Sequence, residues 1–339
     1  MARASKEMVR AAVMGFGIPA ILLAMAIGFL LPQNLDKEIP SDTSANDQIA
    51  QTQPEGSVIE SIEIPVLLDG EVHMLDLESY VIGVVLAEMP ASFEMEALKA
   101  QAVAARTYAL KTCSDGKKHD GAVCGSHLCC QSYMTQEDYL LRGWKERYVK
   151  RVQEAVYATA GQVLIYDGKL IRATYFSCSG GTTEDALQVW GRDYPYLQSV
   201  SSPGEEETVY YTDTKEFTLE DLQDALGVSF QGTVDQWFGE ITYTNGGGID
   251  TMEIGGVTYR GTTLRSLLGL RSTVFEVVAT DSHVCFITKG YGHRVGLSQY
   301  GADAMALTGC GYAEILSHYY LETSLVNFSQ VMVDTNFSK

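Results

Sequence analysis

Residues 11–31 restrict the fold of this chain more than any other feature, because they form a run of 21 residues without a charged side chain. Three basic residues precede the run: Arg3, Lys6 and Arg10. A helix of about 20 apolar residues spans the hydrocarbon core of a membrane, and a basic flank stays on the cytoplasmic side. We therefore expect a cytoplasmic segment at 1–10, a transmembrane anchor at 11–31 and the remainder outside the membrane. A cleaved signal peptide is the alternative, but the run lacks the small residues of a cleavage site at its end.

The rest of the chain divides into a linker and a folded part. Residues 32–60 are polar and acidic, a composition that predicts a disordered linker. From 61 to 339, helical patterns come first and strand patterns later. This order predicts an α+β fold with one mixed helix and antiparallel-strand extracytoplasmic domain, and a sub-domain insertion at about 200–280. The formal net charge of −19 argues against nucleic acid as a partner, because such a surface repels phosphates.

Turn and capping residues locate the elements of the folded part. Asp69-Gly70 predicts a hairpin turn within 65–75, and Asp167-Gly168 predicts a second one within 162–177. Pro90 blocks continuation of a helix that begins near Leu77. Further helices are expected over 93–111, 135–161, 218–227, 263–268 and 312–320.

Glu88 is the first candidate for chemistry, because it lies in Glu88-Met89-Pro90 among apolar neighbours. Apolar surroundings disfavour the charged form of a carboxyl group and raise its pKa. A Glu of this kind can donate a proton near neutral pH, as an acid that breaks glycosidic bonds must. The structural alternative is a glutamate at the edge of the core.

The helix expected after Pro90 carries two cations seven residues apart, Lys99 and Arg106, which share one face. Gln101 and several alanines lie between them. The alternative is a core helix whose cations extend their charged ends to water.

Two glycine-rich segments further along also carry polar groups. The first, 175–183, contains Ser177, Ser179 and Gly180, and glycine allows a ligand to approach the backbone closely. The second, 289–302, contains His293, Ser298, Gln299 and Tyr300, and histidine transfers protons readily at neutral pH. Ordinary polar turns and a structural histidine are the alternatives.

Four of the seven cysteines fall between Cys113 and Cys130, in a loop that also holds histidines. Zinc favours closely spaced Cys and His ligands. The expected ligands are His119, Cys124, Cys129 and Cys130, with His127 as the substitute for Cys129. A disulfide, or reduced thiols without metal, is the alternative.

Three blocks taken in order resemble the stage II sporulation protein D family, membrane-anchored lytic transglycosylases of endospore-forming bacteria. The resemblance covers about residues 62–327. The blocks are Glu88-Met89-Pro90 with the helix at 99–108, Ser179-Gly180-Gly181 with Val189-Trp190-Gly191, and Gly292-His293 with 295–301. Arg294 departs from the pattern, because the family usually has glycine after this histidine.

The resemblance implies a peptidoglycan lytic transglycosylase that cleaves peptide-free glycan strands to 1,6-anhydro ends during engulfment of the forespore. It implies that Glu88 is the sole catalytic acid and base. It also implies a structural zinc ion, a location at the mother-cell membrane facing the septal space, and two partners, a cell-wall amidase and a membrane scaffold protein. The residues expected to hold the glycan are Lys99, Gln101, Arg106, Ser177, Ser179, Gly180, His293, Ser298, Gln299 and Tyr300.

Two other functions remain open at this point. One is a non-catalytic peptidoglycan-binding module that enhances an amidase. The other is a hydrolase with two carboxylates, in which Glu184, Asp185 or Asp193 is the partner of Glu88.

Overall fold

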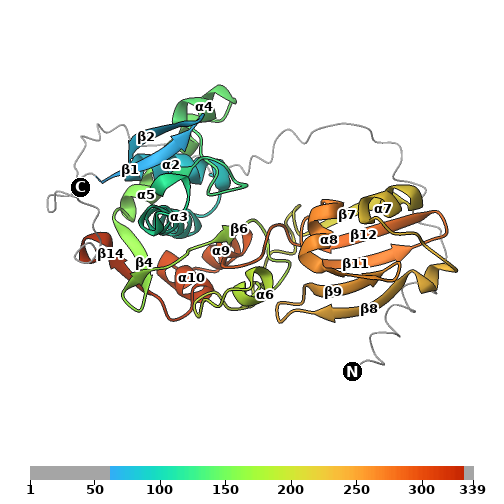
Figure 1. Cartoon of the computed structure of the whole chain (residues 1–339). Coiled ribbons are helices and arrows are strands. Elements are labelled where there is room, and N and C mark those ends of the chain that lie inside the picture. Colours follow the sequence, from blue (N-terminus) through green and yellow to red (C-terminus); the bar gives the residue numbers. More distant parts are fainter. Residues whose placement is uncertain (1–61, 332–339) are drawn as a thin grey trace. The chain divides into compact units, whose positions relative to one another are not determined.

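The computed structural model of the chain describes residues 62–331 (Figure 1). The described part opens with a hairpin of β1 (Glu63–Leu68) and β2 (Glu71–Asp76). Asp69 and Gly70 both have positive φ, 50° and 88°, as a two-residue turn of this kind requires. The predicted hairpin turn is confirmed.

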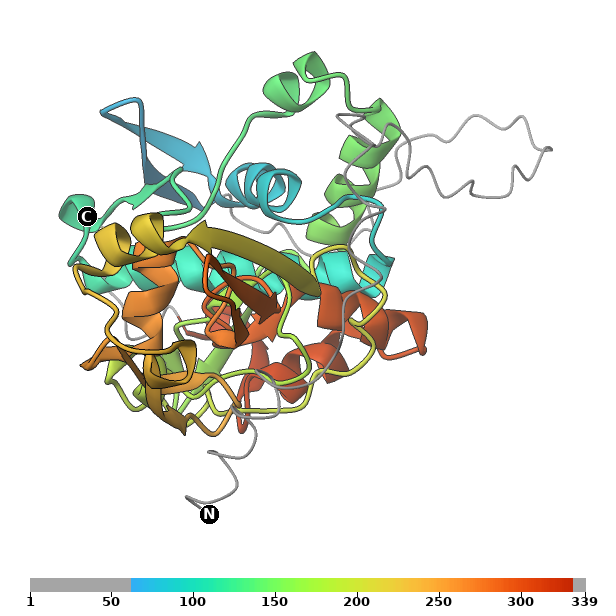
Figure 2. The same ribbon diagram turned by 90° about the vertical axis from the view of Figure 1, so that its right-hand side faces the viewer.

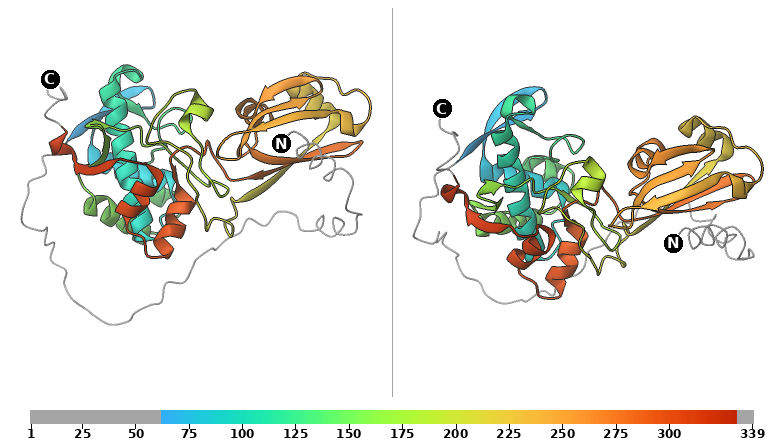
Figure 3. Two further views of the ribbon diagram at one scale, coloured as in Figure 1. Left: turned by 90° about the horizontal axis from the view of Figure 1, so that it is seen from below. Right: turned by 60° about the horizontal axis from the view of Figure 1, so that its bottom comes forward.

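Helix α2 (Leu77–Glu88) follows at once, capped by the side chain of Asp76, and it ends before Pro90 as expected. Helix α3 (Met95–Asp115) begins two residues later than predicted and ends at Gly116 in the left-handed conformation. Its many buried alanines allow neighbours to pack closely on several sides. In Figure 3, α3 runs through the middle of the elements that surround it.

The predicted long helix over 135–161 is wrong, because the structure has two helices there, α4 (Gln136–Leu141) and α5 (Glu146–Ala158) (Figure 2). Gly143 has a φ of 85°, which ends the first helix. The expected start is confirmed, since the Thr135 hydroxyl accepts a hydrogen bond from the amide of Asp138 at 3.0 Å.

The first hydrophobic core gathers around α2, α3 and α5 and includes residues from both ends of the described part. Two of its strand pairs are parallel, β1 with β3 and β6 with β13. The predicted Asp167-Gly168 turn joins β4 to β5, but β5 stops at Leu170, well short of the expected hairpin end. Helices α6 and α9 were not predicted, whereas α10 agrees with the prediction. The other elements here are η2 (His119–Gly121), β3 (Val123–Cys124), β4 (Gln162–Tyr166), β5 (Lys169–Leu170), β6 (Tyr175–Phe176), α6 (Ala186–Trp190), β13 (Leu297–Ser298), α9 (Gln299–Leu307), α10 (Tyr312–Tyr319), β14 (Ser324–Asn327) and η4 (Phe328–Gln330).

A second hydrophobic core lies within residues 217–286 and is built on two three-stranded antiparallel sheets, β10-β9-β8 and β11-β12-β7 (Figure 1). Thr218 caps the first of its helices and Gly227 ends it, as the sequence predicts. The elements are β7 (Thr212–Thr218), α7 (Leu219–Leu226), η3 (Val234–Gln236), β8 (Phe238–Tyr243), β9 (Ile249–Ile254), β10 (Val257–Arg260), α8 (Gly261–Leu268), β11 (Val274–Ala279) and β12 (His283–Lys289).

The predicted fold class, an N-terminal transmembrane helix followed by one helix and antiparallel-strand domain, needs correction. Within residues 62–331, no helix is both long and apolar enough to cross a membrane. Even the 21-residue α3 carries charged side chains along its length. Within residues 62–331 the strands form five small sheets, of which two contain parallel pairs. In both pairs a long stretch of chain separates the two strands, which lets them run in the same direction. The segments predicted at 1–10, 11–31 and 32–60 lie outside the described residues.

Candidate active site

Glu88 is the last residue of α2, and its side chain is half-buried against the first core. Its Oε1 accepts a 2.5 Å hydrogen bond from the backbone amide of Ser132. Burial raises the pKa of this carboxyl, although hydrogen bonds from Ser132 and the charge of His127 oppose the shift. The pKa of Glu88 is therefore shifted upward, in the direction that its apolar sequence neighbours predict.

Gln131, the residue before Ser132, connects the loop that holds Ser132 to the first core through its side-chain hydrogen bonds. Gln131 is buried, and its amide nitrogen donates to Tyr175 Oη at 2.8 Å and to the carbonyl of Ala105 at 3.3 Å. Its Oε1 accepts from Tyr80 Oη at 3.3 Å. Burial and the nearby charge of Glu88 raise the pKa of Tyr175, so this phenol stays neutral beside the carboxyl group. Sequence analysis missed Gln131, Ser132 and Tyr175 as parts of the site.

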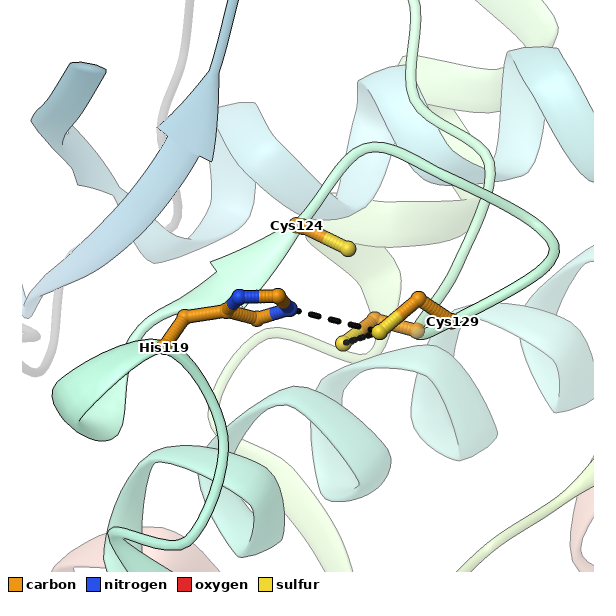
Figure 4. A group of neighbouring side chains, drawn as sticks. His119, Cys124 and Cys129 are labelled. Carbon is orange, nitrogen blue, oxygen red and sulfur yellow. Dashed lines mark hydrogen bonds between the residues drawn. The ribbon is translucent and has the colours of Figure 1, made fainter. Parts of the chain in front are cut away.

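Just before Gln131, the structure gathers His119, Cys124, Cys129 and Cys130, whose ligand atoms lie within 4.8 Å of one another (Figure 4). His119 Nε2 is 3.3 Å from Cys129 Sγ, and the two adjacent sulfurs are 3.9 Å apart. The chain turns at this point, because the amides of Cys129 and Cys130 both donate to the carbonyl of Ser126. That turn lets two consecutive cysteines face the same point.

The thiols of this cluster influence one another. Burial tends to raise the pKa of Cys124, but hydrogen bonds from the Ser126 amide and the neighbouring thiols lower it overall. Burial and the facing Cys124 raise the pKa of Cys130 to about 12. A metal cation bound among the sulfurs would stabilise the thiolate form of Cys130 and so lower the pKa of its thiol.

The geometry fits a tetrahedral metal ion. Two sulfurs bound to one zinc ion at about 2.3 Å each lie about 3.8 Å apart in a tetrahedron, close to the observed separation of Cys129 and Cys130. His127 is exposed and lies outside the group of four. The described residues thus hold a His/Cys cluster that can bind a metal, with Cys129 rather than His127 as the member.

Another polar centre forms around Glu205, a buried residue that sequence analysis missed. Its Oε2 accepts from the amide and hydroxyl of Ser179 at 2.8 and 2.7 Å and from the Gly180 amide at 3.0 Å. Its Oε1 accepts from Ser298 Oγ at 2.5 Å and from Ser202 Oγ at 2.8 Å. The structure therefore brings Ser179, Gly180 and Ser298 together, as structural hydrogen-bond donors to one carboxylate.

His293 lies between two aromatic rings, with centroids 5.6 Å from Phe176 and 5.1 Å from Trp190. Its Nδ1 accepts from the amide of Val295 at 3.1 Å. Burial and the nearby Arg265 lower the pKa of His293 to about 4. This imidazole is neutral at neutral pH, which suits a packing role more than proton transfer.

The remaining predicted residues of the glycine-rich segments lie near these groups. Tyr300 is the second residue of α9 and lies next to Ser177, because its amide donates to the Ser177 carbonyl at 3.0 Å. The Tyr300 ring meets Phe93 edge to face at 4.9 Å. Gln299 is buried, and its Nε2 has no hydrogen-bond partner among residues 62–331.

The cations and the amide of α3 occupy different surroundings from Glu88. Arg106 is fully buried and makes a two-pronged ion pair with Glu78, with Nη2 2.5 Å from Oε2. Lys99 pairs with Glu96 at 2.7 Å. Gln101 is fully buried and unpaired among the described residues. Among residues 62–331, none of these three side chains makes a hydrogen bond to Glu88.

The carboxylates considered as a second catalytic group have other partners. Glu184 Oε1 is 2.9 Å from Arg294 Nη1, and both side chains are buried. Asp185 accepts from the amide of Ser199 and from Asn245. Asp193 lies exposed in the loop after α6. A small cavity beside Glu184 is lined by none of the predicted glycan-binding residues; its lining is Glu184, Gln188, Val189, Thr244, Ile249, Asp250, Arg260, Thr262 and Thr273.

Comparison with known proteins adds independent information about this site. Residues 70–166 match the family described as Stage II sporulation protein. The chain is 35% identical over 320 residues to Stage II sporulation protein D of Bacillus subtilis, covering 90% of this chain and 92% of that protein. The protein of the same name from Bacillus amyloliquefaciens is 35% identical over 319 residues, with 90% and 92% covered. A Bacillus subtilis protein called Amidase enhancer is 29% identical over 300 residues, covering 73% of this chain and 40% of that protein.

Proposed function

The chain belongs to the Stage II sporulation protein family, and from that premise we propose that it is a peptidoglycan lytic transglycosylase in which Glu88 is the catalytic acid and base. Its substrate would be peptide-free glycan strands, cleaved to 1,6-anhydro ends outside the cytoplasm during engulfment. A cell-wall amidase that removes the stem peptides would supply this substrate.

The observation that carries the proposal is the placement of Glu88. Its half-buried carboxyl group has a raised pKa, so it keeps its proton to a higher pH than an ordinary glutamate does. Because Oε1 accepts the short hydrogen bond from Ser132, Oε2 is the oxygen left to hold the proton. Glu88 thus presents one oriented acidic proton.

One carboxyl group is sufficient for this reaction. Glu88 would donate its proton to the glycosidic oxygen as the bond to the anomeric carbon breaks. The resulting carboxylate would then take the proton of the sugar's own 6-hydroxyl as that oxygen attacks the anomeric carbon. The ring closes without water, and Glu88 regains its proton.

A hydrolase would need a second carboxylate close to the first. Among residues 62–331, the groups that act on the pKa of Glu88 are Ser132 and His127, and no other carboxylate is among them. Glu184 is ion-paired with Arg294, and Asp185 accepts hydrogen bonds from Ser199 and Asn245. These contacts favour transglycosylation over hydrolysis.

We also propose that His119, Cys124, Cys129 and Cys130 hold a structural zinc ion. Three thiolates and one imidazole form a donor set that suits zinc and leaves no open position for substrate. When bound, zinc would supply a cross-link that fixes the turn at Ser126. The chain then continues through Gln131 to Ser132, so this turn sets where the amide donor to Glu88 lies.

A non-catalytic module that enhances an amidase is the second candidate, favoured by the similarity to the protein called Amidase enhancer. A module that only binds glycan has no need of an oriented carboxyl group with a raised pKa.

Product analysis separates the candidates. Peptide-free glycan strands would be incubated with the purified full-length chain, and the ends identified by mass spectrometry. Anhydro ends that disappear in Glu88→Gln support transglycosylation. New reducing ends would indicate a hydrolase, and unchanged strands that still bind would indicate the non-catalytic module.

A further inference from the structure

Two exposed tyrosines and an arginine form a cluster that the proposed reaction does not use. The rings of Tyr210 and Tyr291 have centroids 5.9 Å apart, and the Arg271 guanidinium lies 5.7 and 5.5 Å from them. Tyr210 also contacts Tyr300 at 5.6 Å, which in turn contacts Phe93. The two outer rings remain 37% and 41% exposed. The cluster is thus anchored on one side and open on the other.

Hydrogen bonds fix the backbone from which both exposed rings extend. Tyr291 and Cys178 exchange two such bonds, at 2.7 and 3.1 Å. The amide of Tyr210 donates to Thr208 Oγ1 at 3.0 Å. Gly290, just before Tyr291, donates to the carbonyl of Tyr211 at 2.8 Å. The rings are therefore prearranged, so that a ligand need not order them.

The cluster is linked to the Glu88 region through β6. Tyr175, whose pKa responds to the charge of Glu88, begins this strand, and Cys178 follows three residues later. Three residues of extended chain cover about 10 Å. Tyr300 is fixed on the Ser177 carbonyl between these two points. The tyrosines are therefore joined to the residue that faces Glu88 by one short stretch of chain.

The charges around the tyrosine cluster indicate whether its ligand is charged or neutral. Arg271 Nη2 is already paired with Asp213 Oδ1 at 3.2 Å, so its charge is balanced. Its Nη1 is buried without a hydrogen-bond partner in the described part of the chain. Glu206 and Glu207 are exposed close by in sequence and disfavour an anion. An uncharged ligand with an apolar face fits these groups better than a carboxylate or phosphate.

We propose that Tyr210 and Tyr291 form a stacking subsite for an uncharged pyranose ring of the glycan strand, away from the bond that is cleaved; this rests on the proposed function. The C–H face of a pyranose ring carries partial positive charge and packs on the electron-rich face of an aromatic ring. Arg271 holds the two tyrosine rings in place and supplies no charge to the ligand. The subsite makes the chain favour long strands over short oligosaccharides.

The experiment measures binding rather than cleavage, using the full-length chain with Glu88→Gln and isolated peptide-free glycan strands. Tyr210→Leu and Tyr291→Leu remove the aromatic face, and each should weaken the Kd about tenfold, which equals about 1.4 kcal/mol. Tyr210→Phe and Tyr291→Phe keep the face and should bind as the parent does. Tyr157→Leu is the matched control, because Tyr157 is 59% exposed on α5, outside the cluster.

Leucine variants that bind as tightly as the Tyr157→Leu control would overturn the subsite. So would phenylalanine variants that lose as much affinity as the leucine variants. If a leucine variant does not fold, Tyr210→Trp decides the question, since bound strands should shift its fluorescence and leave that of Tyr157→Trp unchanged; no shift at saturation contradicts the subsite. Absence of cleavage by the wild-type chain would refute the proposed reaction alone, because the binding result does not depend on it.

Discussion

The backbone amide of Ser132 donates a 2.5 Å hydrogen bond to Oε1 of Glu88. Ser132 lies two residues after Cys130, so the His/Cys cluster and the candidate acid share one short stretch of chain. An amide donor stabilises the ionised carboxylate and therefore limits how far burial can raise the pKa of Glu88. The pKa of this group is a balance between burial, which raises it, and the hydrogen bonds of Ser132 together with the charge of His127, which lower it.

Glycan cleavage should decline as the pH rises through the raised pKa of Glu88, because the general acid must begin the reaction protonated. The measurement is kcat/KM for peptide-free strands as a function of pH, at constant ionic strength. The alkaline limb should fall at a higher pH than an ordinary glutamate, with a pKa of about 4.3, would give. A rate that rises steadily over the same range would contradict the role of Glu88 as acid.

Glu88→Gln should abolish cleavage without destabilising the fold. Because the folded-state pKa of Glu88 is raised, the favourable contribution of its protonated form is present below the unfolded pKa and is lost as the pH rises through the folded pKa. Glutamine stays uncharged and still accepts from Ser132. The variant should therefore be at least as stable as the parent at neutral pH, with the difference vanishing in acid.

Thermal unfolding at several pH values measures this difference. Glu137→Gln is the control, since Glu137 is exposed on α4 and its removal should leave cleavage and the pH dependence of stability unchanged. Retained cleavage by Glu88→Gln would refute the catalytic assignment.

Cys124→Ser should lower the bound metal and the melting temperature together. Cys124 is a buried member of the cluster, and a structural metal contributes its binding free energy to folding. The metal is quantified by elemental analysis of protein purified without chelators. Cys285→Ser, in the second core's β12, is the control and should keep the parent's metal content. Full metal content in Cys124→Ser would contradict the proposed site.

The sequence predicted what depends on neighbours along the chain. The Asp69-Gly70 turn, the end of α2 before Pro90 and the Thr218 cap all follow from local preferences, and the structure confirms them. The break at Gly143 was missed because the apolar pattern continues across it. Local patterns of this kind cannot exclude a tight turn between two helices.

Features that depend on distant segments could not be predicted in this way. Glu205 collects donors from residues 179–180 and from Ser298, which lie 25 to 93 positions away. The parallel pairing of β6 with β13 joins segments that lie even further apart in the sequence. Lys99 and Arg106 lie seven residues apart on one helix, and the sequence does not distinguish them. Only Arg106 is enclosed by other segments of the chain. Burial of a cation is decided by what packs on the helix, and the helix's own sequence does not specify that.

Arg106→Met should therefore destabilise the fold by about 3 kcal/mol or more, because it leaves Glu78 as a largely buried carboxylate without its cation. Lys99→Met is the comparison, since the Lys99–Glu96 pair is part-exposed and contributes less than about 1 kcal/mol. Denaturant unfolding of both variants gives the two values. Equal, small effects would show that Arg106 is not a core ion-pair partner.

Arg294 occupies the position where the family usually has glycine, with a φ of 64° that favours glycine. Its side chain nevertheless donates to Glu184 Oε1 at 2.9 Å, to the Ser179 carbonyl at 2.7 Å and to the Gly246 carbonyl at 2.8 Å. Arg294→Gly relieves at most about 1 kcal/mol of backbone strain. It also leaves the buried Glu184 carboxylate without its cation, which lowers the free energy of unfolding by about 3–5 kcal/mol. The loss is larger, so the variant should be less stable by about 2–4 kcal/mol.

Adding Glu184→Gln to Arg294→Gly separates the two contributions. The double variant removes the stranded charge, so it should recover part of the stability that Arg294→Gly loses. Denaturant unfolding of the parent, both single variants and the double variant gives the coupling energy between the two residues. A coupling energy near zero would mean that the ion pair does not stabilise this region. Arg294→Gly would then be expected to gain stability from the relieved backbone.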